Sequence, residues 1–173
     1  ITNDYSELKN AHKNGQTLIQ QFIKNQHLIK NHHFNIRLFL LVVCNNGNQN
    51  VYLYNEGNLR YAPEPFDLNN LNNNNIITKG VSADAKIYNN KPITFSEFQK
   101  YLQKKNINNK KLLKDIILLI KNVFRALKPN ICLLKNVDKA TCFQLFGGDF
   151  IVDDKLKPNL LEFNKGPELN CVK

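Results

Sequence analysis

Two carboxylates and an amide near the end of the chain have the chemistry to hold a divalent cation together. If Asp149 and Glu162 faced each other across a hairpin, their repulsion would cost about a few tenths to one kcal/mol unless a cation lay between them. Mg²⁺ prefers oxygen ligands and is commonly held by one or two carboxylates, while nucleotide phosphates and water complete its octahedron. Asn164 offers a third oxygen. These residues therefore predict a magnesium site of the kind that accompanies a nucleotide.

A β-hairpin would bring these three side chains together. Residues 142–152 and 159–164 are rich in apolar residues and flank a polar segment, which predicts two strands and a turn centred near residues 155–156. Antiparallel pairing then places the two carboxylates opposite each other and puts Asn164 on the same face as Glu162. Acidic pairs are more often solvated surface than metal sites. These acids, however, lie within apolar strands, where burial requires pairing or a metal.

The segments before this hairpin predict the remaining strands of a sheet. Residues 16–23 and 36–44 are rich in Val, Ile, Leu and Phe and are bounded by turn signals, as buried strands are. Residues 51–54 predict a further strand. An Asn-Glu-Gly-Asn turn at residues 55–58 leads into another strand at residues 59–62. Together these strands predict an antiparallel meander.

Helical patterns appear after a long polar loop at residues 63–75, whose asparagines we interpret as compositional bias without a function. Thr94 and Glu97 form a capping box that predicts a helix ending near residue 105. A second helix is predicted over residues 110–127, where a Lys-Pro pair ends it. Its core stripe comprises Leu113, Ile116, Ile117, Ile120, Val123, Phe124 and Leu127. The order of strands, helices and strands, without repeat or linker, predicts one α+β domain over residues 1–173.

Composition limits the classes of partner. The 173 residues carry a net charge of +10, which favours an acidic partner, although a solvated lysine-rich face would have the same composition. The longest apolar runs are far shorter than the roughly 20 residues that cross a bilayer, so no membrane span is expected. The four cysteines are widely spaced and form no Cys-x-x-Cys pair. We expect reduced thiols and a cytoplasmic protein, cut from a longer chain because it has neither an initiating Met nor a secretion signal.

Several segments resemble one known family. Residues 145–150 (LFGGDF), 156–158 (LKP) and 161–167 (LEFNKGP) resemble the closing signature of the tubulin-tyrosine ligase-like family. Residues 18–23 (LIQQFI) and 33–37 (HFNIR) are similar, without gaps, to the hinge strand of that family and the strand that follows. The resemblance implies the carboxyl-terminal part of an ATP-grasp fold, an antiparallel sheet with flanking helices.

The resemblance also implies roles for the matching residues. It implies magnesium ligands at Asp149, Glu162 and Asn164. It implies backbone contacts to adenine around Gln20, Gln21, Phe22 and Ile23. It implies positions near the ribose for His33 and Asn35, and a position facing phosphate or a reacting acyl phosphate for Arg37. Residues 57–66 resemble the next family segment, in which the position of Arg60 contacts phosphate or the acceptor carboxylate. Arginine suits such roles because it stays charged and binds two oxygens through parallel hydrogen bonds.

The implied activity is ATP-dependent ligation. With ATP and Mg²⁺, such an enzyme phosphorylates a carboxylate and lets an amine attack the acyl phosphate, adding an amino acid to a protein acceptor such as an acidic tubulin tail. The sequence departs from the family at His33 and Asn35, where Lys and Asp are usual, and has no counterpart of the amino-terminal half of the fold. A Thr-Asn segment of the family maps either to residues 77–79 or to residues 71–73.

Two alternatives follow from the same residues. The first is a catalytically inactive ligase-like module that holds an acidic protein tail through its basic surface, which the departures at His33 and Asn35 favour. The second is a nucleic-acid binder. The charge of +10 supports it, but the sequence has no recognisable motif and lacks the interleaved basic and aromatic residues of a stacking platform.

Overall fold

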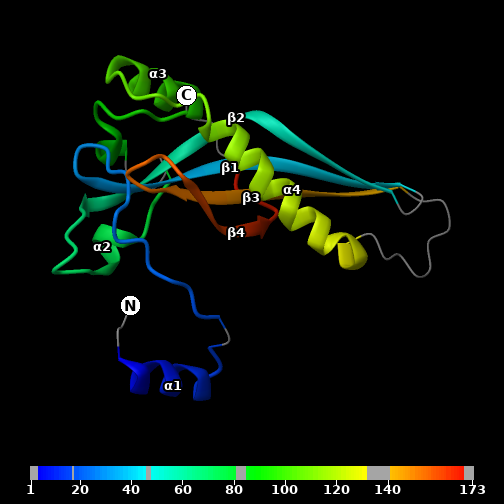
Figure 1. Cartoon of the computed structure of the whole chain (residues 1–173), viewed down its shortest axis with the longest axis horizontal. Helices are drawn as coiled ribbons and strands as arrows, with labels where there is room; N and C mark the ends of the chain where they lie inside the picture. The colour runs from blue at the N-terminus through cyan, green and yellow to red at the C-terminus, as the bar shows by residue number, and fades with distance from the viewer. Residues whose placement is uncertain (1–3, 17, 46–47, 81–84, 132–140, 170–173) are drawn as a thin grey trace.

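A computed structural model of the protein describes residues 4–16, 18–45, 48–80, 85–131 and 141–169. Its centre is a four-stranded antiparallel sheet in the order β2-β1-β3-β4 (Figure 1). The strands are β1 (His32–Asn45), β2 (Asn48–Pro65), β3 (Thr141–Val152) and β4 (Pro158–Lys165). With the helices that flank the sheet, this arrangement confirms the predicted α+β class and the ATP-grasp-like antiparallel sheet.

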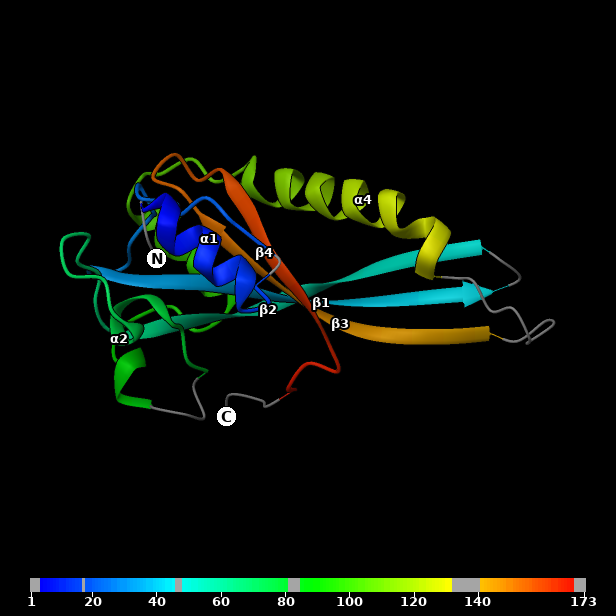
Figure 2. The same ribbon diagram turned by 90° about the horizontal axis from the view of Figure 1, so that it is seen from below.

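The described residues also form helical segments beside the sheet: α1 (Tyr5–Lys13), α2 (Asn73–Ile76), η1 (Ala85–Tyr88), α3 (Phe95–Lys104) and α4 (Leu112–Ile131). The long helix α4 lies along one face of the sheet (Figure 2). Phe124 of α4 packs edge-on against Phe146 of β3, with ring centroids 5.9 Å apart. Helix α3 begins at the capping box predicted from Thr94 and Glu97.

The two faces of β1 differ in chemistry. On the face toward α4, Phe34, Ile36, Leu38, Leu40 and Val42 are each 1% exposed or less, and they form the centre of the core. On the other face, the half of the strand near residues 33–37 carries buried polar side chains. Strand periodicity therefore separates a structural face from a polar face.

One predicted strand and one predicted turn differ from the structure. The described residues of the segment predicted at 16–23, which are 16 and 18–23, form no strand, because their backbone does not pair with the sheet. The side chain of Gln20 donates to the Leu161 carbonyl at 3.3 Å, and Leu18 and Ile19 are exposed. The turn predicted at residues 55–58 is also wrong. β2 runs through it as one strand, with a bulge where β1 advances from Leu38 to Leu40 while β2 advances from Leu53 to Gly57.

The second predicted helix is longer than expected and buries a narrower stripe. Pro129 lies inside the last turn of α4, where it removes only one hydrogen bond near carbonyls that have no helical partner anyway. The buried positions of α4 are Leu112, Ile116, Ile120 and Phe124. Leu113 and Leu127, which we predicted as core, are each 37% exposed because they lie at the edges of this stripe.

The asparagines at residues 72–75 cap a short helix, a role that their composition alone does not indicate. The Asn72 side chain caps α2, accepting from the backbone N–H of Asn74 at 2.7 Å and of Asn75 at 3.3 Å. Asn75 completes the capping box, is 3% exposed, and donates to the Asn70 carbonyl at 2.8 Å. The prediction that this run only fills a loop is therefore wrong.

The cysteines fulfil the expectation of reduced thiols only in part. Cys142 is free, whereas Cys44 is disulfide-bonded, so the expectation is wrong for Cys44. In the part of the chain that the structure describes, no helix has the length and apolar composition that a membrane span requires.

Candidate functional site

A row of polar residues crosses all four strands on the face away from α4. Asn58 of β2 pairs with Arg37 of β1, Arg37 pairs with Asp149 of β3, and Asp149 pairs with Glu162 of β4. Directly paired residues in a sheet share a face. The hairpin therefore places the two carboxylates opposite each other, as its sequence predicts, and β1 adds an arginine to them.

Arg37 and Asp149 form a buried ion pair. The guanidinium donates from Nε to Oδ1 at 2.5 Å and from Nη2 to Oδ2 at 2.7 Å, which is the two-point geometry that arginine favours. Arg37 is 7% exposed and Asp149 is 4% exposed. The hydrogen bonds to Asp149 raise the pKa of Arg37, so the guanidinium is charged at any physiological pH. Asp149 is thus held in one orientation by the neighbouring strand.

Asn164 connects the two carboxylates. Its Nδ2 donates to Oε1 of Glu162 at 2.9 Å and to Oδ2 of Asp149 at 3.3 Å. Glu162 is exposed, whereas Asp149 beside it is buried. The three side chains that were predicted as metal ligands therefore meet at one place, on the surface end of the polar row.

Two adjacent glycines of β3 make room for this arrangement on opposite faces. A Cβ at Gly147 would lie 2.9 Å from Cδ of Arg37 and 2.8 Å from Cβ of Pro167, so a side chain there would collide with both. A Cβ at Gly148 would lie 2.7 Å from the ring of Phe163 on the core face. Gly147 allows Arg37 to lie flat across β3 toward Asp149, and Gly148 allows a phenylalanine to pack beneath.

The donor set fits a magnesium ion. Two carboxylates and an amide offer oxygen atoms, which are the ligands that Mg²⁺ takes, and the exposure of Glu162 leaves one side open for phosphates and water. The amide of Asn164 now turns its NH₂ group to the carboxylates, and its oxygen is available after a flip. Among the described residues, no group of three or more His, Cys, Asp or Glu side chains could hold a metal, so the third oxygen here must come from the amide of Asn164.

The polar face continues along β1 to Asn35 and His33. Both side chains are buried, and Nδ1 of His33 and Oδ1 of Asn35 have no hydrogen-bond partner among the residues that the structure describes. Burial lowers the pKa of His33 from 6.5 to about 4, so its ring is neutral at pH 7. Asn35 pairs across the sheet with Arg60 of β2, whose side chain makes no hydrogen bond or ion pair with any described residue. Polar atoms without partners on one face are ready to accept a polar ligand.

The segment predicted to contact adenine lies beside the outer edge of β4. Gln20 reaches the Leu161 carbonyl, and the Phe22 ring stacks on Phe66 at 6.3 Å with an interplanar angle of 21°. Gln21 is exposed and Ile23 is half-buried. Gln20 thus touches the residue next to Glu162, which places this segment next to the carboxylates without forming a strand.

Sequence reasoning did not find the contributions of Gly147 and Asn58. Glycine weakens a strand interior and often marks a place where other atoms approach closely, so the Gly-Gly pair in an apolar strand was the available signal. The position of Asn58 depends on the pairing of β2 with β1 through the bulge, which no local pattern reveals.

Comparison with known proteins gives a consistent picture. The tubulin-tyrosine ligase family matches residues 1–173. A human protein described as probable tubulin polyglutamylase TTLL2 is 31% identical over 177 aligned residues, covering 95% of this chain and 28% of that protein. Mouse tubulin polyglutamylase TTLL5 is 30% identical over 89% of this chain and 13% of its own length. Mouse tubulin polyglutamylase TTLL11 is 29% identical over 90% of this chain and 24% of its own length. The chain therefore spans less than a third of the length of each of these three relatives.

Proposed function

Because this chain belongs to the tubulin-tyrosine ligase family, we propose that it is the carboxyl-terminal part of an ATP-grasp domain in an ATP-dependent carboxylate-amine ligase. The observation that carries this proposal is the meeting of Asp149, Glu162 and Asn164 on the polar face of the sheet. An acidic protein tail, such as that of tubulin, is the acceptor that we propose, since the relatives are described as tubulin polyglutamylases.

Magnesium-bound ATP would supply the phosphoryl group that activates the substrate carboxylate as an acyl phosphate, which an amine then attacks with release of phosphate. In this proposal Asp149, Glu162 and Asn164 would hold the metal. Each of the first two contributes a negative charge, and Arg37 offsets one of them. As a metal ligand, Asp149 would give up at least one of its two hydrogen bonds to Arg37, and the guanidinium N–H groups would then be free to bind a phosphate.

The remaining polar residues orient the substrates. Arg60 lies on the same face, has no ion-pair partner among the described residues, and is suited to a phosphate or to the acceptor carboxylate. The unpaired polar atoms of His33 and Asn35 are suited to the ribose hydroxyls. The backbone of residues 20–23, beside β4, is suited to the adenine edge.

We place the reaction in the cytoplasm, as the cysteine spacing led us to expect.

Replacing Glu162 by Gln in the full-length protein tests the metal assignment. The substitution removes one charge from an exposed ligand without changing its shape, so we expect ATP turnover to be lost while circular dichroism and the melting temperature stay the same. Glu7→Gln on α1 is the control, because that carboxylate is also exposed and lies on an element with no buried residue. Undiminished ATP consumption by the Glu162→Gln protein would rule out the proposed metal site.

An inactive ligase-like module that only holds an acidic tail is the second candidate. The neutral His33 and Asn35 favour it, because neither adds the charge that Lys and Asp bring to the family site. Titration calorimetry of the full-length protein with Mg-ATP separates the two functions: heat of binding supports the ligase, and its absence supports the inactive module.

A further inference from the structure

The outer edge of β2 has an unpaired stretch. β2 is the last strand of the sheet on its side. Its second half is covered, because Leu59 N–H donates to the Ile93 carbonyl at 2.8 Å and Lys79 N–H donates to the Tyr61 carbonyl at 2.9 Å. Its first half, residues 48–54, pairs with β1 on the inner side and with no described residue on the outer side. Such an edge offers backbone groups to an added strand.

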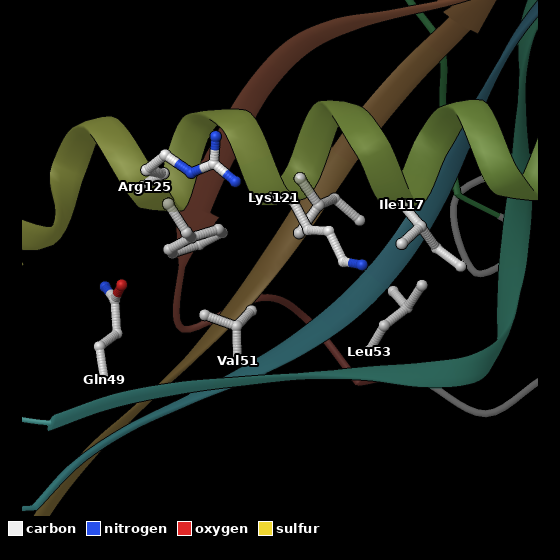
Figure 3. A pocket seen from close by; sticks show the side chains of 8 residues that line it. Gln49, Val51, Leu53, Ile117, Lys121 and Arg125 are labelled. Carbon is white, nitrogen blue, oxygen red and sulfur yellow. The ribbon is translucent and has the colours of Figure 1, made fainter.

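A groove of about 220 Å³ lies between this edge and α4 (Figure 3). Its walls are apolar side chains from the two elements, namely Val51, Leu53, Ile117, Ile120 and Phe124. Val51 and Leu53 alternate with Tyr52 and Tyr54, which are 57% and 62% exposed on the other face of the strand. An added strand would thus have apolar or aromatic neighbours on both faces.

Basic and amide groups border the groove. Lys121 and Arg125 are one helical turn apart on α4, and Figure 3 shows Lys121 reaching down toward β2. Both are exposed, and neither forms an ion pair with any residue that the structure describes. Gln49 of β2 lies below Arg125 (Figure 3), and its Nε2 is buried without a hydrogen-bond partner in the described part of the chain. The groove therefore combines apolar walls with three hydrogen-bond donors, Lys121, Arg125 and Gln49, that can bind carboxylate oxygens.

We propose that this groove and the adjoining edge of β2 form a docking site for an extended acidic protein segment, bound as an additional strand. Main-chain hydrogen bonds to residues 48–54 hold the segment, an apolar side chain enters the groove, and acidic side chains meet Lys121 and Arg125. The net charge of +10 adds a general attraction for such a partner.

The observations favour a peptide over a nucleic acid. A nucleic acid would use the cations but not the apolar groove, and it has no backbone that continues a β-sheet. The groove also lies on the α4 face, whereas Arg37 and Asp149 lie on the opposite face. The site is therefore separate from the carboxylates. That the bound segment belongs to the acceptor rests on the proposed function, whereas the binding itself does not.

Fluorescence anisotropy of the full-length protein without nucleotide tests the proposal. The probe is a fluorescein-labelled glutamate-rich peptide with leucines at alternate central positions. Two double variants are compared: Lys121→Glu with Arg125→Glu on α4, and Lys100→Glu with Lys104→Glu on α3. All four residues are exposed, both pairs are four residues apart on a helix, and both change the net charge equally. A second peptide carries proline between the leucines and so cannot pair as a strand.

We expect the α4 variant to weaken binding roughly tenfold or more and the α3 variant to change it little. We also expect the proline peptide not to bind. Equal weakening by both variants, equal binding of the proline peptide, or displacement of the probe by single-stranded DNA at similar concentration would overturn the proposal. The Glu162→Gln protein should bind the peptide normally, so a failure of docking and a failure of the metal assignment give different results.

Discussion

At the scale of single residues, the charge balance of the polar row explains why it is suited to a cation. Asp149 and Glu162 contribute two negative charges at facing positions, and the buried guanidinium of Arg37 balances only the first. A buried carboxylate without a partner costs several kcal/mol, so Arg37 makes the burial of Asp149 tolerable. The exposed Glu162 keeps its charge for a ligand.

Gly147→Ala tests how closely Arg37 must approach β3. The added Cβ collides with Cδ of Arg37 and with Pro167, so we expect a loss of about 1–3 kcal/mol in stability and a weaker affinity for Mg-ATP. Gly148→Ala is the matched comparison, because its Cβ meets Phe163 on the core face. That variant should lose similar stability without changing nucleotide affinity. Thermal melting and calorimetry measure the two effects, and an unchanged Mg-ATP affinity in Gly147→Ala would contradict the proposed use of Arg37.

The buried ring of His33 makes stability depend on pH. Its pKa is about 4 in the folded protein and near 6.5 in the unfolded chain, so between these values only the unfolded chain binds the proton. Stability is therefore complete above pH 6.5 and falls as the pH drops toward 4, by about 3 kcal/mol in all. Burial also lowers the pKa of His27, but His33→Gln keeps that group. Urea unfolding across this range should show a shallower pH dependence in the variant, and identical slopes would refute the assignment.

At the scale of elements, sequence patterns predicted the helix caps and turns that depend on neighbouring residues. The α3 capping box and the β3-β4 hairpin follow from neighbouring residues, and Asp149 met Glu162 because a short turn fixes their register. The ion pair of Arg37 and Asp149 could not be predicted from the sequence, since it depends on β1 pairing with β3 across more than a hundred residues. The Gly57 segment looked like a turn because a bulge uses the same residues.

Helix α2 offers a direct test of the asparagine run. Asn72→Ala removes the side chain that accepts from the backbone N–H of Asn74 and Asn75, so we expect a loss of about 1 kcal/mol. Asn73→Ala, which changes an exposed neighbour inside the helix, should have a much smaller effect. Thermal melting of both variants measures the difference. Equal effects would mean that the run has no more structural role than its composition suggested.

At the scale of the whole molecule, the apolar core and the polar candidate site lie on opposite faces of one sheet. The face toward α4 carries the fully buried apolar residues of β1, and the opposite face carries the polar row with its unpaired atoms. Alternation of apolar and polar residues along β1 is visible in the sequence, but the burial of both sets is not, because it depends on partners distant in the chain, such as Asp149 for Arg37. The same strand therefore serves two purposes at successive positions.

This separation predicts opposite effects for two substitutions in β1 of the full-length protein. Leu40→Ala creates a cavity at a fully buried position and should cost about 2–5 kcal/mol in stability, while the folded protein keeps its KM for ATP. Asn35→Ala removes an amide whose oxygen has no hydrogen-bond partner among the described residues, so stability should change little. If that oxygen accepts from the ribose, the KM for ATP rises about fivefold, the equivalent of one hydrogen bond. Melting temperatures and steady-state kinetics measure both quantities in each variant. A raised KM in Leu40→Ala, or an unchanged KM in Asn35→Ala, would contradict the assignment of stability to one face and of ATP binding to the other.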